Sequence, residues 1–408
     1  MSKIKPFKAL RPRADLAAKV SSAPYDVVYW SEARDEAERD PQTFLRVTRP
    51  DGDFPEHEQP AAAELFLRAR QNLDSLIEHG VYAVDPEPAV YVYRLTLGEQ
   101  SQTGLVACCS IDEYERGLIK KHEKVRPDKV EDRTEHILTV GAQTGLIFLA
   151  FRGTDTTAGL FAAAVKDEPL YDFEGDDGVR HTLWRVTEAG PWIDAFAELP
   201  ELYVADGHHR AESAFLARTR MRERYPDYTG DEPFNYVFAG IFPADDLAIM
   251  AYNRVVTGLI GLSESEFFER LGESFIVGPS DHKEPAARGE ICMYIGGKWY
   301  SMRSNVQYVR EPDAIERLDV SVLQKYVLEP ILGIMDVRTD ERIGFVGGRR
   351  GTEELERMVD SGKATVAFSM FPTTMDDLFA VSDMGEIMPP KSTWFEPKLK
   401  DGLLVHVI

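Results

Sequence analysis

The apolar positions of this chain follow two patterns, helical spacing in some stretches and short continuous runs in others. Leucines recur near helical spacing from residue 60 to Gly80, which predicts an amphipathic helix ending at a glycine C-cap. Short apolar runs bounded by Gly- and Asp-rich stretches predict strands. We expect strands at Val90–Leu97, Leu105–Ile111, Ile147–Phe151, Phe161–Val165, Thr182–Val186, Leu202–Ala205, Tyr236–Phe242, Ile291–Ile295, Ile343–Val346, Thr365–Phe368 and Leu403–Val407. Further helices are expected at Ser31–Arg39, over the charged stretch 112–136, from about residue 206 to Tyr225, and at Glu264–Ser274, Val320–Leu328 and Glu353–Val359.

Strands and helices mix without the regular period of βαβ units, which predicts an α+β fold of mixed sheets with flanking helices. A length of 408 residues suggests two or three domains. We expect an N-terminal α+β region at residues 1–150, a central core at 151–260, and a C-terminal α+β region at 261–408 that closes the site.

Composition narrows the classes of protein to consider. Hydrophobic residues make up 43% and charged residues 28%, which is typical of a soluble globular protein. The net charge of -22 argues against nonspecific nucleic-acid binding and against docking on anionic membranes. This charge is still compatible with a local basic pocket that binds a small anion. Cys108, Cys109 and Cys292 form no Cys-x-x-Cys pair, so neither a disulfide framework nor a structural zinc site is expected. The N-terminus lacks the apolar core of a signal peptide and no apolar run reaches about 18 residues, so we expect a cytoplasmic protein without a membrane span.

The segment Asp-Gly-His-His-Arg at Asp206–Arg210 joins an expected strand directly to the following helix. A helix start offers unpaired backbone N–H groups and a partial positive charge. Gly207 lets the backbone approach a bound anion closely, and Arg210 adds a forked donor suited to phosphate. The junction therefore predicts an anion site.

Three further side chains of this junction carry chemistry. Asp206 can bind a divalent metal or accept a substrate proton, and His208 and His209 can stabilise the charge of a transferred phosphate. The alternative is an Asp N-cap with two surface histidines. We favour a functional site because this combination is rare at a strand–helix junction.

The charged stretch 120–136 admits two interpretations. A solvated helix with many salt bridges would produce such a run without any function. Alternatively, Lys121 and Arg126 line a path for phosphates, and Glu123 holds a metal or orients a substrate hydroxyl. The sequence leaves both interpretations open.

Two more segments are candidates. Lys391, Ser392 and Thr393 follow a proline-restricted stretch and offer an ammonium and two hydroxyls, a set that suits a phosphate or a carboxylate. Near the N-terminus, Asp26 in Ala-Pro-Tyr-Asp-Val can act as a second acidic group, either as a metal ligand or as a general base. The alternatives are a structured connector for the first segment and an ordinary turn for the second.

Five segments together resemble the bacterial and archaeal family known as domain of unknown function 1015, and the match spans nearly the whole chain. The segments are Ile4–Pro12, Pro24–Val27, Lys120–Glu123, Val204–Arg210 and Met388–Phe395. The Asp206–Arg210 segment also resembles the phosphate loop of ParB/sulfiredoxin-type nucleotide-binding folds, a group in which free-serine kinases carry a similar segment. The cysteine that sulfiredoxin uses is missing here, so its redox chemistry does not transfer.

The resemblance implies a ParB/sulfiredoxin-like core within residues 151–260 and a small-molecule kinase. Such a kinase would take ATP or ADP with Mg²⁺ and phosphorylate free L-serine to O-phosphoserine. His208, His209 and Arg210 would contact phosphates, Asp206 and Glu123 would hold the metal, and Lys391 or Arg126 would bind the serine carboxylate.

Two alternatives to the kinase stay open, a nucleotide-binding regulator without catalysis and a metal-dependent phosphohydrolase. The expected partners are a nucleotide and a small hydroxylated metabolite. The sequence leaves the oligomeric state open, and a homodimer is one assembly we consider.

Overall fold

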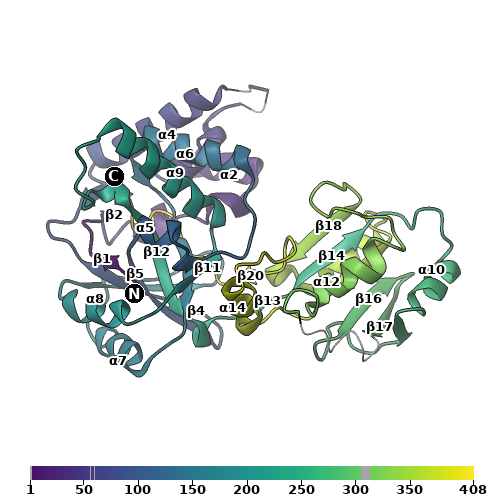
Figure 1. Ribbon diagram of the computed structural model, residues 1–408. Coiled ribbons are helices and arrows are strands. Elements are labelled where there is room, and N and C mark those ends of the chain that lie inside the picture. The colour runs from purple at the N-terminus through teal and green to yellow at the C-terminus, as the bar shows by residue number, and fades with distance from the viewer. Residues whose placement is uncertain (1, 56, 59, 305–312) are drawn as a thin grey trace. The chain divides into compact units, whose positions relative to one another are not determined.

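The computed structural model describes residues 2–55, 57–58, 60–304 and 313–408 (Figure 1). Contacts divide the chain into two compact units. Unit 1 comprises Met1–Lys121, Val125–Leu247 and Pro397–Ile408, and unit 2 comprises His122–Lys124 and Ala248–Glu396. Residue 150 falls inside a strand of unit 1, and the last residues of the chain return to unit 1.

Unit 1 combines strands with helices from most of the first 247 residues. Its strands are β1 (Ile4–Lys5), β2 (Leu10–Pro12), β3 (Tyr82–Val84), β4 (Val90–Leu97), β5 (Gln100–Ser110), β6 (Ile119–Lys120), β7 (Ala142–Gln143), β8 (Ile147–Phe151), β9 (Tyr171–Glu174), β10 (Arg180–Val186), β11 (Leu202–Asp206), β12 (Tyr236–Pro243) and β21 (His406–Val407). Its α-helices are α1 (Ala17–Val20), α2 (Trp30–Arg39), α3 (Leu45–Thr48), α4 (Ala62–Glu78), α5 (Ile111–Glu115), α6 (Pro127–Val140), α7 (Asp155–Ala164), α8 (Gly190–Ala197) and α9 (His208–Arg224). Short 3₁₀ helices are η1 (Tyr25–Val27), η2 (Pro50–Asp53), η3 (Pro233–Asn235) and η4 (Ala244–Asp246).

The main sheet of unit 1 has nine strands in the order β6-β11-β8-β12-β5-β4-β10-β9, with β1 beside β5. It is mixed, because β6 pairs with β11 and β8 pairs with β12 in parallel, while the other pairs are antiparallel. Figure 1 shows α4, α6 and α9 grouped together, and α7 with α8 grouped separately. This mixed sheet with flanking helices confirms the expected α+β class.

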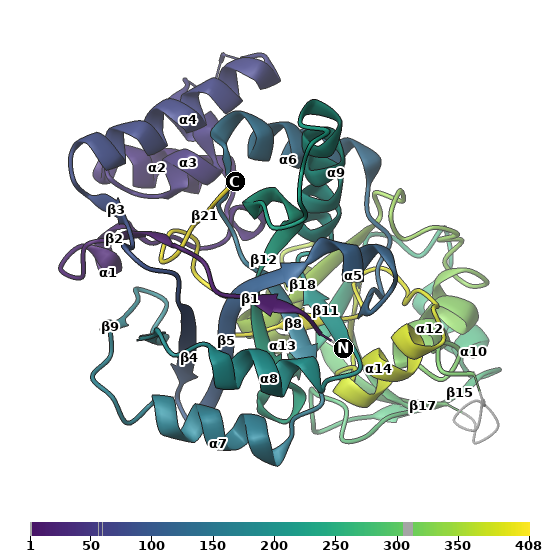
Figure 2. The same cartoon turned by 60° about the vertical axis from the view of Figure 1, so that its left-hand side comes forward.

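The two faces of the main sheet have different coverings. Alternate residues such as Leu149, Val204 and Ile241 share a hydrophobic cluster with side chains of α7, α8 and α9. On the other face, Phe238 packs against Phe7 and His406, with ring centroids 5.4 Å and 6.4 Å away. The N-terminal and C-terminal segments of the chain therefore cover this second face. They lie side by side (Figure 2), joined by bridges from Leu10 to Val405 and from Ser22 to Asp401.

Unit 2 is built on an antiparallel sheet. Its strands are β13 (Ile249–Met250), β14 (Tyr252–Val256), β15 (Phe275–Pro279), β16 (Glu290–Ile295), β17 (Lys298–Ser304), β18 (Ile343–Gly347), β19 (Val366–Ser369) and β20 (Trp394–Phe395). Its helices are α10 (Glu264–Leu271), α12 (Asp319–Leu323), the π-helical turn η5 (Gln324–Leu328), the 3₁₀ turn η6 (Gly348–Arg350), α13 (Gly351–Asp360) and α14 (Met375–Asp383). Six strands form the sheet in the order β15-β17-β16-β19-β14-β18, and β13 pairs with β20.

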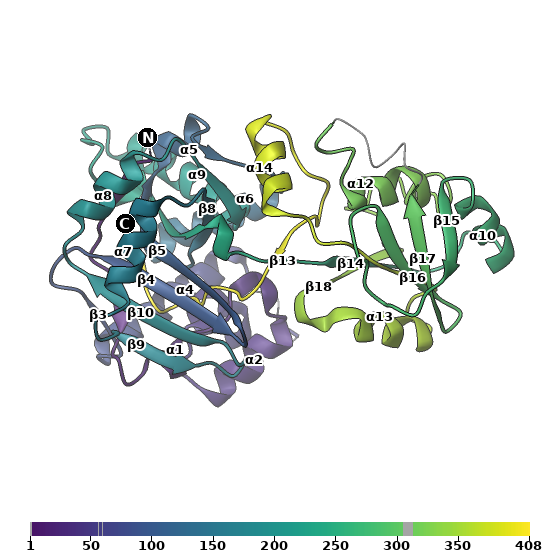
Figure 3. The same ribbon diagram turned by 90° about the horizontal axis from the view of Figure 1, so that it is seen from below.

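Helices cover both faces of the unit 2 sheet (Figure 3). Neighbouring residues of one strand point to opposite faces, so Val255 and Val256 enter different clusters. Val255 packs with Leu355 of α13, whereas Val256 packs with residues of α10 and α12 such as Phe267. Each unit therefore has a hydrophobic core of its own.

Two expected elements are wrong. The apolar run Phe161–Val165 is not a strand but the end of α7 and its C-cap, because Thr154 caps a helix that begins at Asp155. The charged stretch 112–136 is not one helix, because it is divided among α5, β6 and α6. The C-terminal run is a strand only at His406–Val407. Within the described ranges, no helix is both long and apolar enough to cross a membrane.

Candidate functional site

A β-bulge turns Asp206 out of the alternation of its strand. Val204 lies opposite Leu149 of β8, but Asp206 lies opposite Phe148, so two residues of β11 advance against one of β8. Opposite residues of an antiparallel pair point to the same face, and Phe148 packs with Phe242 on the face away from Leu149. The bulge therefore aims Asp206 at the face that the two terminal segments cover.

On that face Asp206 meets Lys398 of the C-terminal segment. The Lys398 ammonium donates to Oδ2 of Asp206 at 2.8 Å, and the backbone N–H of Gly207 donates to Oδ1 at 2.8 Å. Burial disfavours a charged carboxylate, but Lys398 and Arg210 more than offset it, so the pKa of Asp206 lies below its usual range. Asp206 is an ionised group at neutral pH.

Gly207 makes the turn from β11 into α9 in a left-handed conformation, with φ at +89°. A Cβ here would lie 3.1 Å from Nε of Arg210 and 3.4 Å from Cα of Ile147, so the turn also packs closely. Gly207 is the N-cap of the 17-residue α9 and has no side chain to accept from its first N–H groups. This is the geometry expected of an anion site at a helix start.

Arg210 lies behind this turn with its side chain only 11% exposed. One of its amino groups donates to the carbonyl of Leu146, and the other lies 3.5 Å from Oδ2 of Asp26. Burial disfavours the charged guanidinium, but Asp26, Asp206 and Asp401 outweigh it and hold the pKa of Arg210 above its usual range. The structure thus brings Asp26 and Arg210 together.

The two histidines differ in their surroundings. His208 is buried, with 4% of its surface exposed. Nε2 of His209 accepts the backbone N–H of Arg126 at 3.0 Å. This bond ties the start of α9 to Arg126, the N-cap of α6. The guanidinium of Arg126 pairs with Asp128 at 2.8 Å on the surface.

Lys121 belongs to a separate cluster in unit 1. Its ammonium lies 2.9 Å from Oε2 of Glu212 and 3.9 Å from the ring centroid of Tyr114, whose hydroxyl also donates to Glu212. These contacts neutralise the charge of Lys121. The salt bridge of Lys121 agrees with the interpretation of residues 120–136 as a solvated segment with many salt bridges.

The remaining expected residues, Glu123 and Lys391–Thr393, belong to unit 2. Lys391 has a left-handed backbone with φ at +59°, and its carbonyl accepts from buried Arg254 at 3.2 Å. The Ser392 hydroxyl donates to the carbonyl of Pro389 at 2.6 Å, and the Thr393 hydroxyl lies 3.4 Å from Nε2 of His122. The Ser392 hydroxyl thus bonds within its own loop, whereas the Thr393 hydroxyl contacts His122.

A metal centre was expected at Asp206 and Glu123. Within the part of the chain that the structure describes, no group of three or more His, Cys, Asp or Glu side chains lies together as a metal site. The two expected ligands fall in different units, and one oxygen of Asp206 already accepts from Lys398.

The sequence interpretation missed Lys398 and Asp401. Asp401 is 2% exposed and interacts electrostatically with Arg210 and Asp26. A signal was present, because Lys398 and Asp401 lie among apolar residues such as Leu399 and Leu403, in a stretch that also contains Glu396 and Lys400. A charged side chain in such a stretch needs a partner in the interior, and Asp206 and Arg210 were the candidates at hand.

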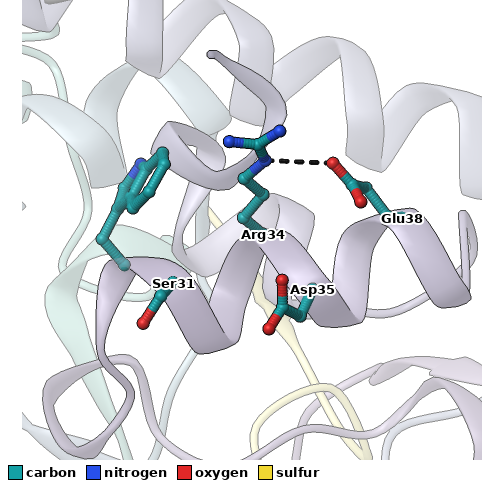
Figure 4. A pocket seen from close by; sticks show the side chains of 5 residues that line it. Ser31, Arg34, Asp35 and Glu38 are labelled. Atoms are coloured by element: carbon teal, nitrogen blue, oxygen red, sulfur yellow. Dashed lines mark hydrogen bonds and ion pairs between the residues drawn. The ribbon is translucent and has the colours of Figure 1, made fainter. Parts of the chain in front are cut away.

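A separate pocket of about 480 Å³ lies on the surface of α2. Figure 4 shows four of its lining residues, Ser31, Arg34, Asp35 and Glu38, on one helix. Arg34 and Glu38 form an ion pair at 3.0 Å across one turn, so they satisfy each other. None of the residues expected in the functional site lines this pocket.

Comparison with known proteins gives a family and a set of distant structures. The model of a family described as "Protein of unknown function (DUF1015)" matches residues 4–321. A search of the curated proteins found no match. The chain is similar to a conserved hypothetical protein from Pyrococcus furiosus, with 14% identity and a TM-score of 0.36 over 74% of this chain and 95% of that one.

Two further solved structures are similar at the same low level. One is a mutant free serine kinase in complex with ADP, with 16% identity and a TM-score of 0.36 over 73% of this chain and 92% of that one. The other is SbnI with a C-terminal truncation from Staphylococcus aureus, with 13% identity and a TM-score of 0.40 over 74% and 87% of the two chains. At such TM-scores none of these similarities transfers an activity to this chain.

Proposed function

Since this chain belongs to the DUF1015 family, whose description names no activity, we propose from its own residues that it is a nucleotide-dependent phosphotransferase. The donor would be ATP or ADP, and the acceptor a hydroxyl of a small metabolite. Free L-serine is the acceptor that we propose to test first, because the resemblance of the Asp206–Arg210 segment implies it.

One observation carries the proposal. Two partly exposed carboxylates, Asp26 and Asp206, interact with the same guanidinium beside the helix start at Gly207. The helix start and its cations suit phosphate binding. A carboxylate next to the phosphates repels them unless it holds Mg²⁺, so the second carboxylate favours catalysis over nucleotide binding alone. In protein kinases a carboxylate accepts the proton of the acceptor hydroxyl during phosphoryl transfer.

Asp26 fits the role of general base. Its side chain is 39% exposed, so an acceptor can reach it, and its contact with Arg210 fixes its position. We propose that Asp26 takes the proton of the acceptor hydroxyl while the acceptor oxygen bonds to the phosphorus of the donor. The bond between that phosphorus and the bridging oxygen of the nucleotide breaks, and the bridging oxygen keeps the electron pair.

The other junction residues would bind and orient the phosphates. The N–H groups at the start of α9 would donate to phosphate oxygens, and His208 and His209 would contribute polar contacts there. Mg²⁺, where bound, would neutralise phosphate charge. Mg²⁺ commonly binds through one or two carboxylates plus substrate phosphates. Oδ2 of Asp206 already accepts from Lys398, so Asp206 would bind the metal through Oδ1. Within unit 1, Arg126 stays a candidate for the substrate carboxylate, and Lys121 and Arg126 stay candidates for further phosphate contacts.

The direct test incubates the full chain with ATP or ADP, Mg²⁺ and a panel of hydroxylated metabolites that includes L-serine, with products read by mass spectrometry. We expect a phosphorylated product from at least one acceptor. The variant Asp26→Asn should lower turnover by about 10²–10⁴-fold, the usual contribution of a general base, and leave nucleotide affinity within a few fold. The control Asp194→Asn changes an exposed aspartate on α8 and should leave turnover unchanged.

The outcomes separate the alternatives. Tight nucleotide binding with no product from any acceptor would contradict the transferase and favour a regulator. Release of phosphate at an equal rate with and without acceptors would favour a phosphohydrolase. Equal turnover of Asp26→Asn and the parent protein would remove Asp26 from the mechanism.

A further inference from the structure

The C-terminal segment buries a carboxyl group beside the proposed site. Asp401 is 2% exposed, and two backbone hydrogen bonds fix its position. Its N–H donates to the carbonyl of Ser22 at 2.9 Å, and the N–H of Ser22 donates to its carbonyl at 3.0 Å. Ser22 lies only four residues before Asp26, so this bridge also anchors the loop that carries Asp26.

The carboxyl of Asp401 has an unusual environment for an acid. In the described part of the chain, no hydrogen-bond partner reaches its Oδ2 and no cation lies within ion-pair distance of it, although the backbone N–H of Tyr25 donates to the carboxyl. Its Oδ1 lies so close to Gly145 that a Cβ there would be 2.8 Å away, which leaves the carboxyl little freedom to move. Nε of Arg210 is also buried without a partner.

The charged and titratable groups that act on Asp401 come from five neighbouring elements. They are Asp26 and Tyr25 of η1, Tyr82 of β3, Tyr93 of β4, Arg133 of α6, and Arg210 of α9. Arg133 stacks on the Tyr25 ring at 4.7 Å and pairs with Asp132 at 2.6 Å, so it is already neutralised. Asp206 has Lys398. Arg210 is therefore the cation that Asp26 and Asp401 share.

The two carboxylates that share this guanidinium differ in their exposure to water. The exposed Asp26 keeps water around its charge, whereas the buried Asp401 loses it. We propose that Asp401 is a positioning residue whose uncharged carboxyl leaves Arg210 paired with Asp26, and whose ionisation draws Arg210 away from Asp26. The catalytic consequence rests on the proposed function, but the coupling among the three groups does not.

The electrostatics agree with the geometry. Burial raises the pKa of Asp401 to about 7, with Asp26 adding to the rise and Arg210 opposing it. Asp401 would then change its charge near neutral pH, where the second negative charge competes for Arg210. We expect nucleotide affinity to fall by about tenfold from pH 6 to pH 8, the equivalent of one pKa unit of interaction, because the junction gains a negative charge.

The test uses the free protein and therefore does not depend on any activity. With ¹³C-labelled aspartate, the Asp26 Cγ resonance should show an inflection at the pH at which Asp401 titrates, and the Nε resonance of Arg210 should shift with it. The variant Asp401→Asn should remove both responses. The matched control is Asp319→Asn, which removes another buried carboxyl whose pKa burial raises to about 7, but in unit 2, and should leave both responses intact.

A second measurement, by infrared spectroscopy, tests the proposal even if Asp401→Asn fails to fold. In Asp319→Asn, which lacks the other buried carboxyl with a pKa raised to about 7, the infrared band of a protonated carboxyl should disappear as the pH rises through 7, and adding Gly145→Ala should shift this band because its Cβ presses on Oδ1 of Asp401. Titration of Asp401 without any response at Asp26 or Arg210 would overturn the proposal. So would an Asp26 inflection that survives Asp401→Asn.

The two proposals fail separately. Coupled resonances with no phosphorylated product from any acceptor would leave the positioning role standing and remove the transferase. A phosphorylated product whose pH profile is identical in Asp401→Asn and the parent protein would support the transferase and remove the positioning role of Asp401.

Discussion

Lys398 and Asp206 form the ion pair at the centre of the junction, and the pair decides how Asp206 can act. With its carboxylate held by an ammonium at 2.8 Å, Asp206 is a poor proton acceptor but a fixed negative charge. Its contribution to stability has a definite sign. Because the pKa of Asp206 is lower in the folded than in the unfolded state, the stabilisation is present above about pH 4, the unfolded value, and is lost as the pH falls further.

The variant Lys398→Met tests this pair, because methionine keeps much of the apolar stem and removes the charge. We expect unit 1 to lose about 1–3 kcal/mol of unfolding free energy at pH 7, the usual effect of removing one partner of a charged hydrogen bond. Less stability should then be lost between pH 5 and pH 3 than in the parent protein, since the pKa of Asp206 rises. Hydrogen exchange of β11 in denaturant measures both quantities.

The matched control for that measurement is Lys129→Met, which removes an exposed ammonium from α6 and should change neither quantity. An unchanged pH dependence in Lys398→Met would show that the pair does not set the ionisation of Asp206.

Residues of the site differ in how far the sequence could identify them. Asp206, Gly207 and Arg210 are contiguous, so a local motif suffices to find them. Lys398 contacts Asp206 across 192 positions of the chain, and no local pattern encodes such a pairing. Similarly, the sequence named Asp26 and Arg210 separately, but only the folded sheet brings them to 3.5 Å.

At the level of elements, the junction depends on a bulge and one left-handed glycine between β11 and α9. The variant Gly207→Ala tests this turn. Alanine at φ of +89° is strained, and its Cβ would press on Nε of Arg210, so we expect a loss of about 1–3 kcal/mol in unit 1. Nucleotide affinity should fall too, because the helix start moves. Urea unfolding and calorimetric titration measure the two effects.

The control is Gly190→Ala at the first position of α8, where φ is not positive and a Cβ would have open space. We expect a gain of about 0.4–1 kcal/mol there, since alanine narrows the unfolded ensemble. A loss at Gly190 equal to that at Gly207 would mean that left-handed strain is not the cause.

The elements themselves were predictable where a pattern is long or bounded by clear turns. The strands Val90–Leu97 and Ile147–Phe151 occur where their apolar runs predicted them. The run Phe161–Val165 misled because a short apolar stretch fits a strand and a buried helical turn equally well, and the cap at Thr154 decides between them. The bulge at Asp206 has no sequence signal, since it follows from pairing with β8.

At the scale of the whole molecule, the chain returns to its first unit after building the second. Residues Pro397–Ile408 belong to unit 1, although the family match ends at residue 321. Lys398 and Asp401 therefore reach the junction from outside the matched region. Domain limits read along the sequence could not show this, because composition does not change where the chain re-enters unit 1.

Each unit has a separate hydrophobic core, which predicts two cooperative unfolding transitions. Phe196 of α8 and Phe267 of α10 are both fully buried, the first in the core of unit 1 and the second in that of unit 2. Truncation of either ring should cost about 3–5 kcal/mol, because it leaves a cavity. We expect Phe196→Ala to destabilise the peptides of unit 1 and Phe267→Ala those of unit 2, as measured by hydrogen exchange in increasing denaturant.

Each of these two variants is the control for the other, since the residue type, the burial and the volume removed are the same. Loss of protection in both units from either variant would show that the chain unfolds as one body. Nucleotide gives an independent check, because a ligand stabilises the unit that binds it. If the junction binds nucleotide, ADP should offset the destabilisation in Phe196→Ala by restoring protection to β11 and α9.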